Sequence, residues 1–149
     1  MTKLFQNEAP DSFRPEDLES YAQTFLQAPV GPSGHGCIVI RAGEHGSLTV
    51  SRSQPGFWSP PFYKEGDSEV IDPTGAGNAY LGGFIAGWQQ CKSLVEAASY
   101  GNVAASFALQ QIGLPTLQKL EGYETWNGIQ SLSRLEEYKA RLKQGEKVI

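Results

Sequence analysis

Residues that could perform chemistry are concentrated in one glycine-rich string, Val70-Ile71-Asp72-Pro73-Thr74-Gly75-Ala76-Gly77-Asn78, which leads into a helical pattern. Glycines at 75 and 77 can adopt positive φ, and a helix that starts beside them adds unpaired N–H donors and a positive dipole end. Gly75, Ala76 and Gly77 are therefore predicted to form an anion hole. Phosphoryl transfer also needs a group that accepts the proton of an attacking hydroxyl, and Asn78 occupies that place.

Neither common phosphate fingerprint matches this string. GxxxxGK[ST] is absent, and Gly75-Ala76-Gly77 lacks the third glycine of GxGxxG at its usual spacing. A bare GxG before a helix also fits a tight strand-to-helix turn. Likewise, Asp72 could brace a cation or simply cap its own turn, and Asn78 could be a capping residue.

The elements before the string are a helix and a hairpin. Pro15 and the acids after it mark a helix start, and the helix ends before Pro29. Its predicted buried face is Leu18, Tyr21, Ala22, Phe25 and Leu26. Residues 37–41 and 47–52 are rich in β-branched side chains and flank the turn 43–46, which predicts a β-hairpin.

The elements around and after the string are mainly helical. We expect residues 53–67 to be irregular and to form a strand edge or a covering loop. We also expect a brief strand over 69–71 and helices from about 78 to 90 and 93 to 111. Small residues in the second helix predict close packing. We expect a loop over 116–130, and then a last helix with a Ser133/Glu136 capping box.

Composition narrows the class of protein. The chain has 149 residues, 40% of them hydrophobic, and 12 basic against 16 acidic side chains, giving a net charge of −4. These values predict one folded domain and disfavour nucleic acid or an anionic membrane as a partner. The N-terminus lacks an apolar signal region, so we expect an intracellular, cytoplasmic protein. Cys37 and Cys91 are expected to be buried free thiols.

The string resembles the second signature of the pfkB family of carbohydrate kinases, D-T-x-G-A-G-D followed by an aromatic residue and a glycine pair. Asp72, Thr74, Gly75, Ala76 and Gly77 match it. The resemblance covers roughly residues 37–116. Within the family, the strings at 72–78, 103–108 and 124–128 look most like a fungal, maintenance-of-killer-like branch.

The resemblance implies an α/β fold, the ribokinase-like three-layer sandwich, of which residues 1–149 would be the C-terminal, nucleotide-binding half only. It implies a parallel sheet that carries ligands at the carboxyl ends of its strands. It also implies ATP with magnesium, a sugar-like substrate, and nucleotide contacts from Gly43, Gly46 and Asn102 in addition to Gly75 and Gly77. Asp72 and Thr74 would lie where some relatives bind a monovalent cation.

Three departures bear on activity. The family has Asp, the catalytic base, where this chain has Asn78, and a missing base lowers rates by about 10²–10⁴. The N-terminal substrate half is absent, and Asn7-Glu8 does not reproduce the family's N-x-x-E, which helps organise magnesium. Relatives often carry Thr where Arg41 stands.

Two functions therefore stay open. One is ATP-dependent phosphoryl transfer to a sugar-like hydroxyl, weak or inactive in this chain. The other is a pseudokinase or scaffold module that keeps the nucleotide-binding fold. Because half a sheet leaves an edge unpaired and an apolar face exposed, we also expect a protein partner or self-association through that edge.

Overall fold

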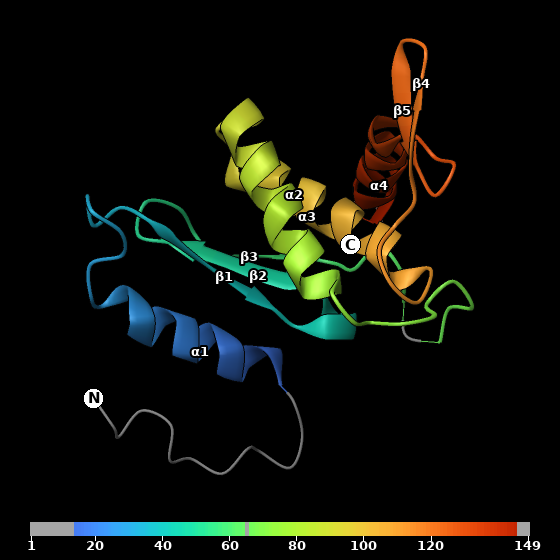
Figure 1. Cartoon of the computed structure of the whole chain (residues 1–149). Helices are drawn as coiled ribbons and strands as arrows, with labels where there is room; N and C mark the ends of the chain where they lie inside the picture. Colours follow the sequence, from blue (N-terminus) through green and yellow to red (C-terminus); the bar gives the residue numbers. More distant parts are fainter. Residues whose placement is uncertain (1–13, 65, 146–149) are drawn as a thin grey trace.

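The structure is a computed structural model that describes residues 14–64 and 66–145 (Figure 1). Asn7, Glu8 and the N-terminal segment used for the localisation prediction lie outside these residues. The helices are α1 (Pro15–Leu26), α2 (Ala76–Cys91), α3 (Leu94–Leu109) and α4 (Ser131–Gly145), with a 3-10 turn at Gly43–His45. The strands are β1 (Cys37–Arg41), β2 (Ser47–Ser51), β3 (Phe57–Ser59), β4 (Leu117–Leu120) and β5 (Tyr123–Trp126).

A three-stranded sheet lies between two layers of helices. Its order is β1-β2-β3, with α1 against one face and the α2/α3 pair against the other (Figure 1). Successive strand residues face opposite sides, so Leu48 and Val50 pack on Ala22 and Leu26 of α1. On the opposite face, Val39 packs with the helix pair. The three-layer α/β/α arrangement expected from the sequence is therefore present.

Glycines set the close approach of α2 and α3. A Cβ at Gly83 would lie 2.5 Å from the carbonyl oxygen of Tyr100, and one at Gly101 would lie 2.8 Å from the Tyr80 ring. The two helices can therefore pack this closely only because Gly83 and Gly101 have no side chain. This confirms the close packing predicted from the small residues of the second helix.

The region after α3 forms a third core cluster. Phe107 of α3 and Phe62 pack with Leu135 and Tyr138 of α4. The hairpin β4–β5 is fixed to α3 by Asn127, whose Nδ2 donates to the carbonyl oxygen of Phe107 over 3.0 Å. These contacts place α4 beside the loop that contains residues 60–64.

The segment 69–71 is not a strand, contrary to the sequence prediction. The N–H groups of Ile71 and Asp72 both donate to the carbonyl oxygen of Leu109, at 2.8 and 3.2 Å. The segment therefore satisfies the C-terminal end of α3 and does not join the sheet. In the described residues both sheets pair their strands antiparallel, so the expected parallel sheet is not seen either.

Other boundaries also differ. Helix α2 begins at Ala76, which makes Asn78 its third residue and not its first. Residues 116–130 contain the hairpin β4–β5, and α4 begins at Ser131. The Ser133/Glu136 capping box is therefore wrong, since the hydroxyl of Ser133 contacts the side chain of Gln130 inside the first turn.

Several apolar side chains expected in the interior lie on the surface. Tyr21 and Phe25 of α1 are 46% and 47% exposed, and Cys91 is exposed while Cys37 is half-buried. On α2, an exposed apolar stripe is formed at helical spacing by Leu81, Ile85 and Trp88.

None of the described helices is long and apolar enough to cross a bilayer.

Candidate functional site

A cleft of about 410 Å³ lies where the sheet, the start of α2 and the middle of α3 meet. Its walls bring together five of the residues predicted to bind nucleotide or phosphate: Gly43, Gly46, Ala76, Gly77 and Asn102. The remaining predicted residues are not among those that line it: Asp72, Thr74, Gly75 and Asn78.

The glycine turn before α2 leaves two backbone donors available. Gly75 is the helix N-cap, with φ of 83° in the left-handed region that favours glycine. Ala76 N–H donates to the carbonyl oxygen of Pro73 and Asn78 N–H to that of Gly75, at 3.2 and 3.0 Å. Among the described residues, the N–H groups of Gly75 and Gly77 have no acceptor. The turn can therefore offer these two donors, together with the positive end of α2, to an anion.

Asp72 braces this turn. Its Oδ1 accepts a hydrogen bond of 2.9 Å from the N–H of Thr74, an Asx-type contact. Hydrogen bonds from Thr74 hold the pKa of Asp72 below its usual range. The turn-capping alternative therefore describes this carboxylate, and a monovalent cation at Asp72 and Thr74 stays a prediction.

The turn after β1 closes the opposite wall of the cleft. The N–H of Ala42 donates to the carbonyl oxygen of Gly46 over 2.8 Å. Gly46 has φ of 87°, and a Cβ there would lie 2.1 Å from the carbonyl oxygen of Ser59. Gly43 has φ of 58° and open space around it. Gly46 is thus required by packing as well as by conformation, whereas Gly43 is required by conformation alone.

Arg41 is a cleft residue that sequence reasoning noted only as a departure from the family pattern. Its guanidinium lies against Gly77, because a Cβ built on Gly77 would be 2.5 Å from Nη1. Strand alternation could have suggested this position, since Arg41 shares a face of β1 with Val39, which packs toward α2 and α3. The structure therefore places a cation beside the predicted anion hole.

Asn102 is buried at the α3 wall of the cleft. Its Nδ2 donates to the hydroxyl of Tyr138 over 3.0 Å, and that hydroxyl donates to the carbonyl oxygen of Pro60 over 2.5 Å. Burial raises the pKa of Tyr138 well above its usual value. The amide is thus held in one orientation, with one donor already committed to Tyr138.

Asn78 lies on the exposed side of the first turn of α2, outside the cleft lining. A neutral amide has no proton-accepting capacity comparable to a carboxylate. Glu44 supplies the carboxylate among the residues that line the cleft. Its Oε1 lies 3.6 Å from Nε2 of His45. The described residues contain no group of three or more His, Cys, Asp or Glu side chains that could hold a metal ion.

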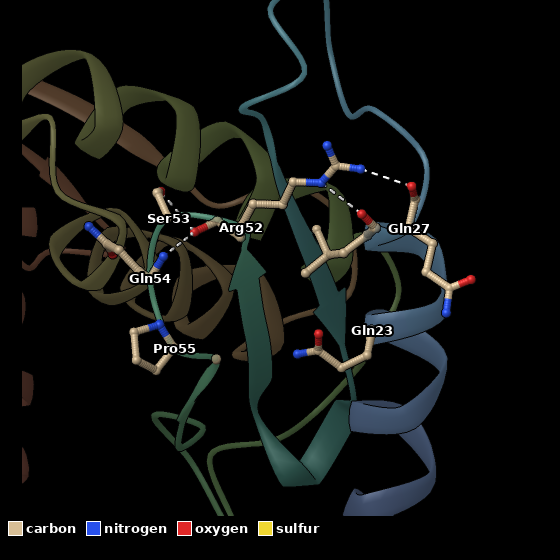
Figure 2. Close-up of a pocket in the computed structure, with 9 residues that line it drawn as sticks. Gln23, Gln27, Arg52, Ser53, Gln54 and Pro55 are labelled. Carbon is tan, nitrogen blue, oxygen red and sulfur yellow. Dashed lines mark hydrogen bonds between the residues drawn. The ribbon is translucent and has the colours of Figure 1, made fainter.

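Two other cavities have no such combination of groups. A shallow hollow of about 640 Å³ lies beside the end of α1 (Figure 2). Its cation, Arg52, donates from Nε to the carbonyl oxygen of Leu26 and from Nη2 to that of Gln27, at 2.8 and 2.9 Å. Arg52 therefore satisfies the last carbonyls of α1 and fixes the helix to the sheet. An apolar cleft of about 440 Å³ between α2, α3 and α4 is lined by no charged side chain.

The sequence of this chain is similar to those of known proteins. A family model described as "pfkB family carbohydrate kinase" matches residues 12–119. Protein MAK32 of Saccharomyces cerevisiae is 39% identical over 106 residues, which are 67% of this chain and 28% of MAK32. An uncharacterised protein of Schizosaccharomyces pombe is 32% identical over 133 residues, 80% of this chain and 37% of that protein. Both are fungal, in agreement with the branch expected from the sequence.

A solved structure shares the fold. The crystal structure of a nucleoside kinase from Methanocaldococcus jannaschii, an archaeal member of the ribokinase family, matches with a TM-score of 0.55 at 23% identity. The match covers 82% of this chain and 38% of that one. The chain thus spans less than two fifths of the length of each of these three proteins.

Proposed function

Because the chain belongs to the pfkB family of carbohydrate kinases, we propose that its cleft binds ATP and serves phosphoryl transfer to a sugar-like hydroxyl. The observation that carries this proposal is the convergence of Gly43, Gly46, Gly77 and Asn102 on one cleft. These residues come from the sheet, the start of α2 and the middle of α3. A fold that brings them together supports a nucleotide site better than the glycine turn alone.

The phosphate end of ATP is assigned to the start of α2. The free N–H groups of Gly75 and Gly77 and the helix dipole suit a group whose negative charge grows during transfer. Asn102, fixed by Tyr138, lies at the α3 wall, where the base of the nucleotide is expected. Magnesium bound to the nucleotide would neutralise phosphate charge, and ATP would bring it to the site.

The weak step is deprotonation of the acceptor hydroxyl. At the position where the family has a carboxylate, the amide of Asn78 can orient a hydroxyl but cannot take its proton. A positioned base contributes about 10²–10⁴ in rate, so turnover by this chain is expected to be lower by that order. The acceptor site is assigned to the part of the fold that the relatives have and this chain does not span.

The neutral, exposed Asn78 favours a second function, a pseudokinase that binds nucleotide without turning it over. In that case the cleft would act as a structural or regulatory nucleotide site, and the surface of the domain would serve assembly with another protein. The two functions share the binding step and differ in catalysis. A binding measurement followed by a turnover measurement therefore separates them.

The first experiment is calorimetric titration of the chain with Mg·ATP. Binding in the micromolar to millimolar range supports a nucleotide site. Absence of binding, by this chain and by a form extended upstream, overturns both nucleotide-dependent functions and favours a scaffold that keeps the fold without the ligand. The second measures ADP formation in the presence of a mixture of hexoses and nucleosides, for the native sequence, Asn78→Asp and Asn78→Ala, each in a form extended upstream to include the acceptor part of the fold that the relatives have. The alanine variant removes the amide without adding a base.

The kinase proposal predicts that Asn78→Asp raises turnover and that Asn78→Ala does not. Equal turnover in all three proteins, with Mg·ATP binding intact, contradicts the kinase proposal and supports the pseudokinase. Because Asn78 is exposed, neither substitution is expected to unfold α2, and the circular dichroism of each variant checks this.

A further inference from the structure

We propose that Arg41 is a phosphate-binding residue that makes the cleft prefer polyphosphate-bearing ligands over the free nucleoside. This inference rests on the proposed function for its nucleotide but concerns a different contact. The glycine turn alone would make a neutral anion hole. Arg41 adds a full positive charge to it.

The fold fixes where this charge lies. Arg41 is the last residue of β1 and pairs with Ser47 of β2, which places its side chain on the sheet face toward α2. That face is already held to α2 by the hydrogen bond of 2.8 Å from the hydroxyl of Tyr80 to Oγ of Ser47. The root of the arginine side chain is therefore positioned by buried structure, although the residue itself is exposed.

Gly77 lets the guanidinium reach the start of α2. The Cβ that any other residue would carry there would lie 2.5 Å from Nη1 and 3.3 Å from Cζ of Arg41. Non-bonded atoms do not approach so closely, so a side chain at 77 would displace the guanidinium. The glycine thus has a second role besides its free N–H group, namely to admit the cation.

Among the described residues no carboxylate is bonded to this cation, although Glu44 lines the same cleft. Arg41 makes no hydrogen bond or ion pair in the described part of the chain, and the first turn of α2 contains no acidic residue. Asn78, where the family has Asp, adds no negative charge either. A guanidinium that is bonded to no carboxylate and lies beside the positive end of a helix favours an anion between the two.

Phosphate is the anion that these donors suit. A guanidinium presents N–H groups in a planar fork that matches two phosphate oxygens, and the N–H group of Gly77, which also lines the cleft, can meet another. Asn102 lies at the other wall of the same cleft. A ligand with a polyphosphate at one end and a base at the other spans both.

The test compares three ligands by calorimetry on the native chain, Arg41→Thr, Arg41→Lys and Arg14→Thr. The ligands are Mg·ATP, inorganic tripolyphosphate and adenosine. Threonine is the residue that relatives often carry, and lysine keeps the charge without the fork. Arg14→Thr is the matched control, because it removes the same charge at the start of α1, on the opposite face of the sheet.

Loss of charge-assisted hydrogen bonds is expected to weaken Mg·ATP and tripolyphosphate binding by about 10- to 100-fold in Arg41→Thr, and by less in Arg41→Lys. Adenosine affinity is expected to stay unchanged in every variant, and Arg14→Thr is expected to alter no affinity by more than about twofold. The salt dependence of tripolyphosphate binding is expected to become shallower in Arg41→Thr.

Native affinity of Arg41→Thr for both phosphate ligands overturns the inference, as does an equal loss for adenosine. Failure of the proposed function gives a different result. Tripolyphosphate then binds through Arg41, adenosine does not bind, and Mg·ATP binds no more tightly than tripolyphosphate. Unchanged thermal midpoints of the variants ensure that a lost affinity reports the contact and not the fold.

Discussion

The side-chain amide of Asn102 donates to the hydroxyl of Tyr138 over 3.0 Å, and so links the middle of α3 to α4 across 36 residues of sequence. The same hydroxyl donates to the carbonyl oxygen of Pro60. One buried oxygen therefore aligns the α3 wall of the cleft, the last helix and the loop after β3. Its removal tests how far the cleft depends on α4.

Tyr138→Phe is expected to destabilise the chain by about 1–3 kcal/mol, since it leaves two buried polar groups without their partner. Urea unfolding at neutral pH measures this loss. Tyr123→Phe, on the exposed hairpin, is the control and is expected to have little effect. A Tyr138→Phe protein as stable as the native one would show that water replaces the lost hydroxyl.

Stability is also expected to fall at alkaline pH. Burial raises the pKa of Tyr138 and of Tyr80 above the ordinary value, which is about 10 in an unfolded chain. Below that pH both states keep the phenolic protons, and the contribution of these groups is fully present. Above it the unfolded chain loses protons that the folded chain retains, so the free energy of unfolding decreases. Thermal midpoints from pH 7 to 11.5 should fall above pH 10, and less steeply in Tyr138→Phe.

Two adjacent glycines of α2 should respond in opposite ways to alanine. Gly83→Ala places a Cβ 2.5 Å from the backbone of α3, whereas a Cβ at Gly82 meets nothing within 4 Å. Gly82→Ala is expected to stabilise the helix by about 0.5–1 kcal/mol, and Gly83→Ala to destabilise the chain by more than about 1 kcal/mol through overpacking. Urea unfolding of both variants provides the comparison, and equal effects would contradict the close helix contact.

Arg134 is a buried cation, and no carboxylate in the part of the chain that the structure describes is bonded to it. Its Nη1 donates to Oγ of Ser106 and to Oε1 of Gln110, and its guanidinium lies 4.0 Å from the centre of the Phe107 ring. Arg134→Lys keeps a more strongly hydrated charge without the planar contact, and is expected to cost about 1–3 kcal/mol. Arg134→Met is expected to cost less, because methionine packs on aromatic rings without a buried charge. Chemical unfolding that ranks the two in the reverse order would show that the charge itself stabilises α4.

The exposed apolar stripe of α2 predicts self-association or attachment of a partner. Leu81, Ile85 and Trp88 are 38%, 57% and 40% exposed on one face of the helix. At micromolar concentrations we expect sedimentation velocity to show species larger than the monomer, and Ile85→Lys to reduce them. Gln90→Lys, exposed on the side of the same helix away from the stripe, is the control and should leave the distribution unchanged.

Local patterns predicted most of the fold. The hairpin of β1 and β2, α1 and the two long helices follow from periodicity and glycine turns, and all are present. The hairpin β4–β5 was missed because its residues are mostly exposed and lack alternating burial, although Glu121-Gly122 between two short runs is a turn signal. Val70 and Ile71 suggest a strand. In the structure the N–H groups of Ile71 and Asp72 donate to the carbonyl oxygen of Leu109. Because Leu109 is distant in sequence, no local pattern indicates this contact.

The site was predictable only in part for a similar reason. Structurally required glycines can be recognised in the sequence, because positive φ or close packing excludes other residues, as at Gly46. The contact of Arg41 with Gly77 depends on how β1 and α2 pack together. The bond between Tyr138 and Asn102 depends on where α4 returns, which no local pattern specifies.

The two hydrogen bonds that Ile71 and Asp72 donate to Leu109 also restrain the glycine turn. These hydrogen bonds tie the glycine turn to the last turn of α3, and the turn continues directly into α2. Arg41 and the turn at 43–46 belong to the sheet, which contacts α2 through Ser47 and Tyr80. A molecule that contacts both acts as a cross-link between them, and its arrival is expected to slow amide hydrogen exchange in β1 and in α2 together.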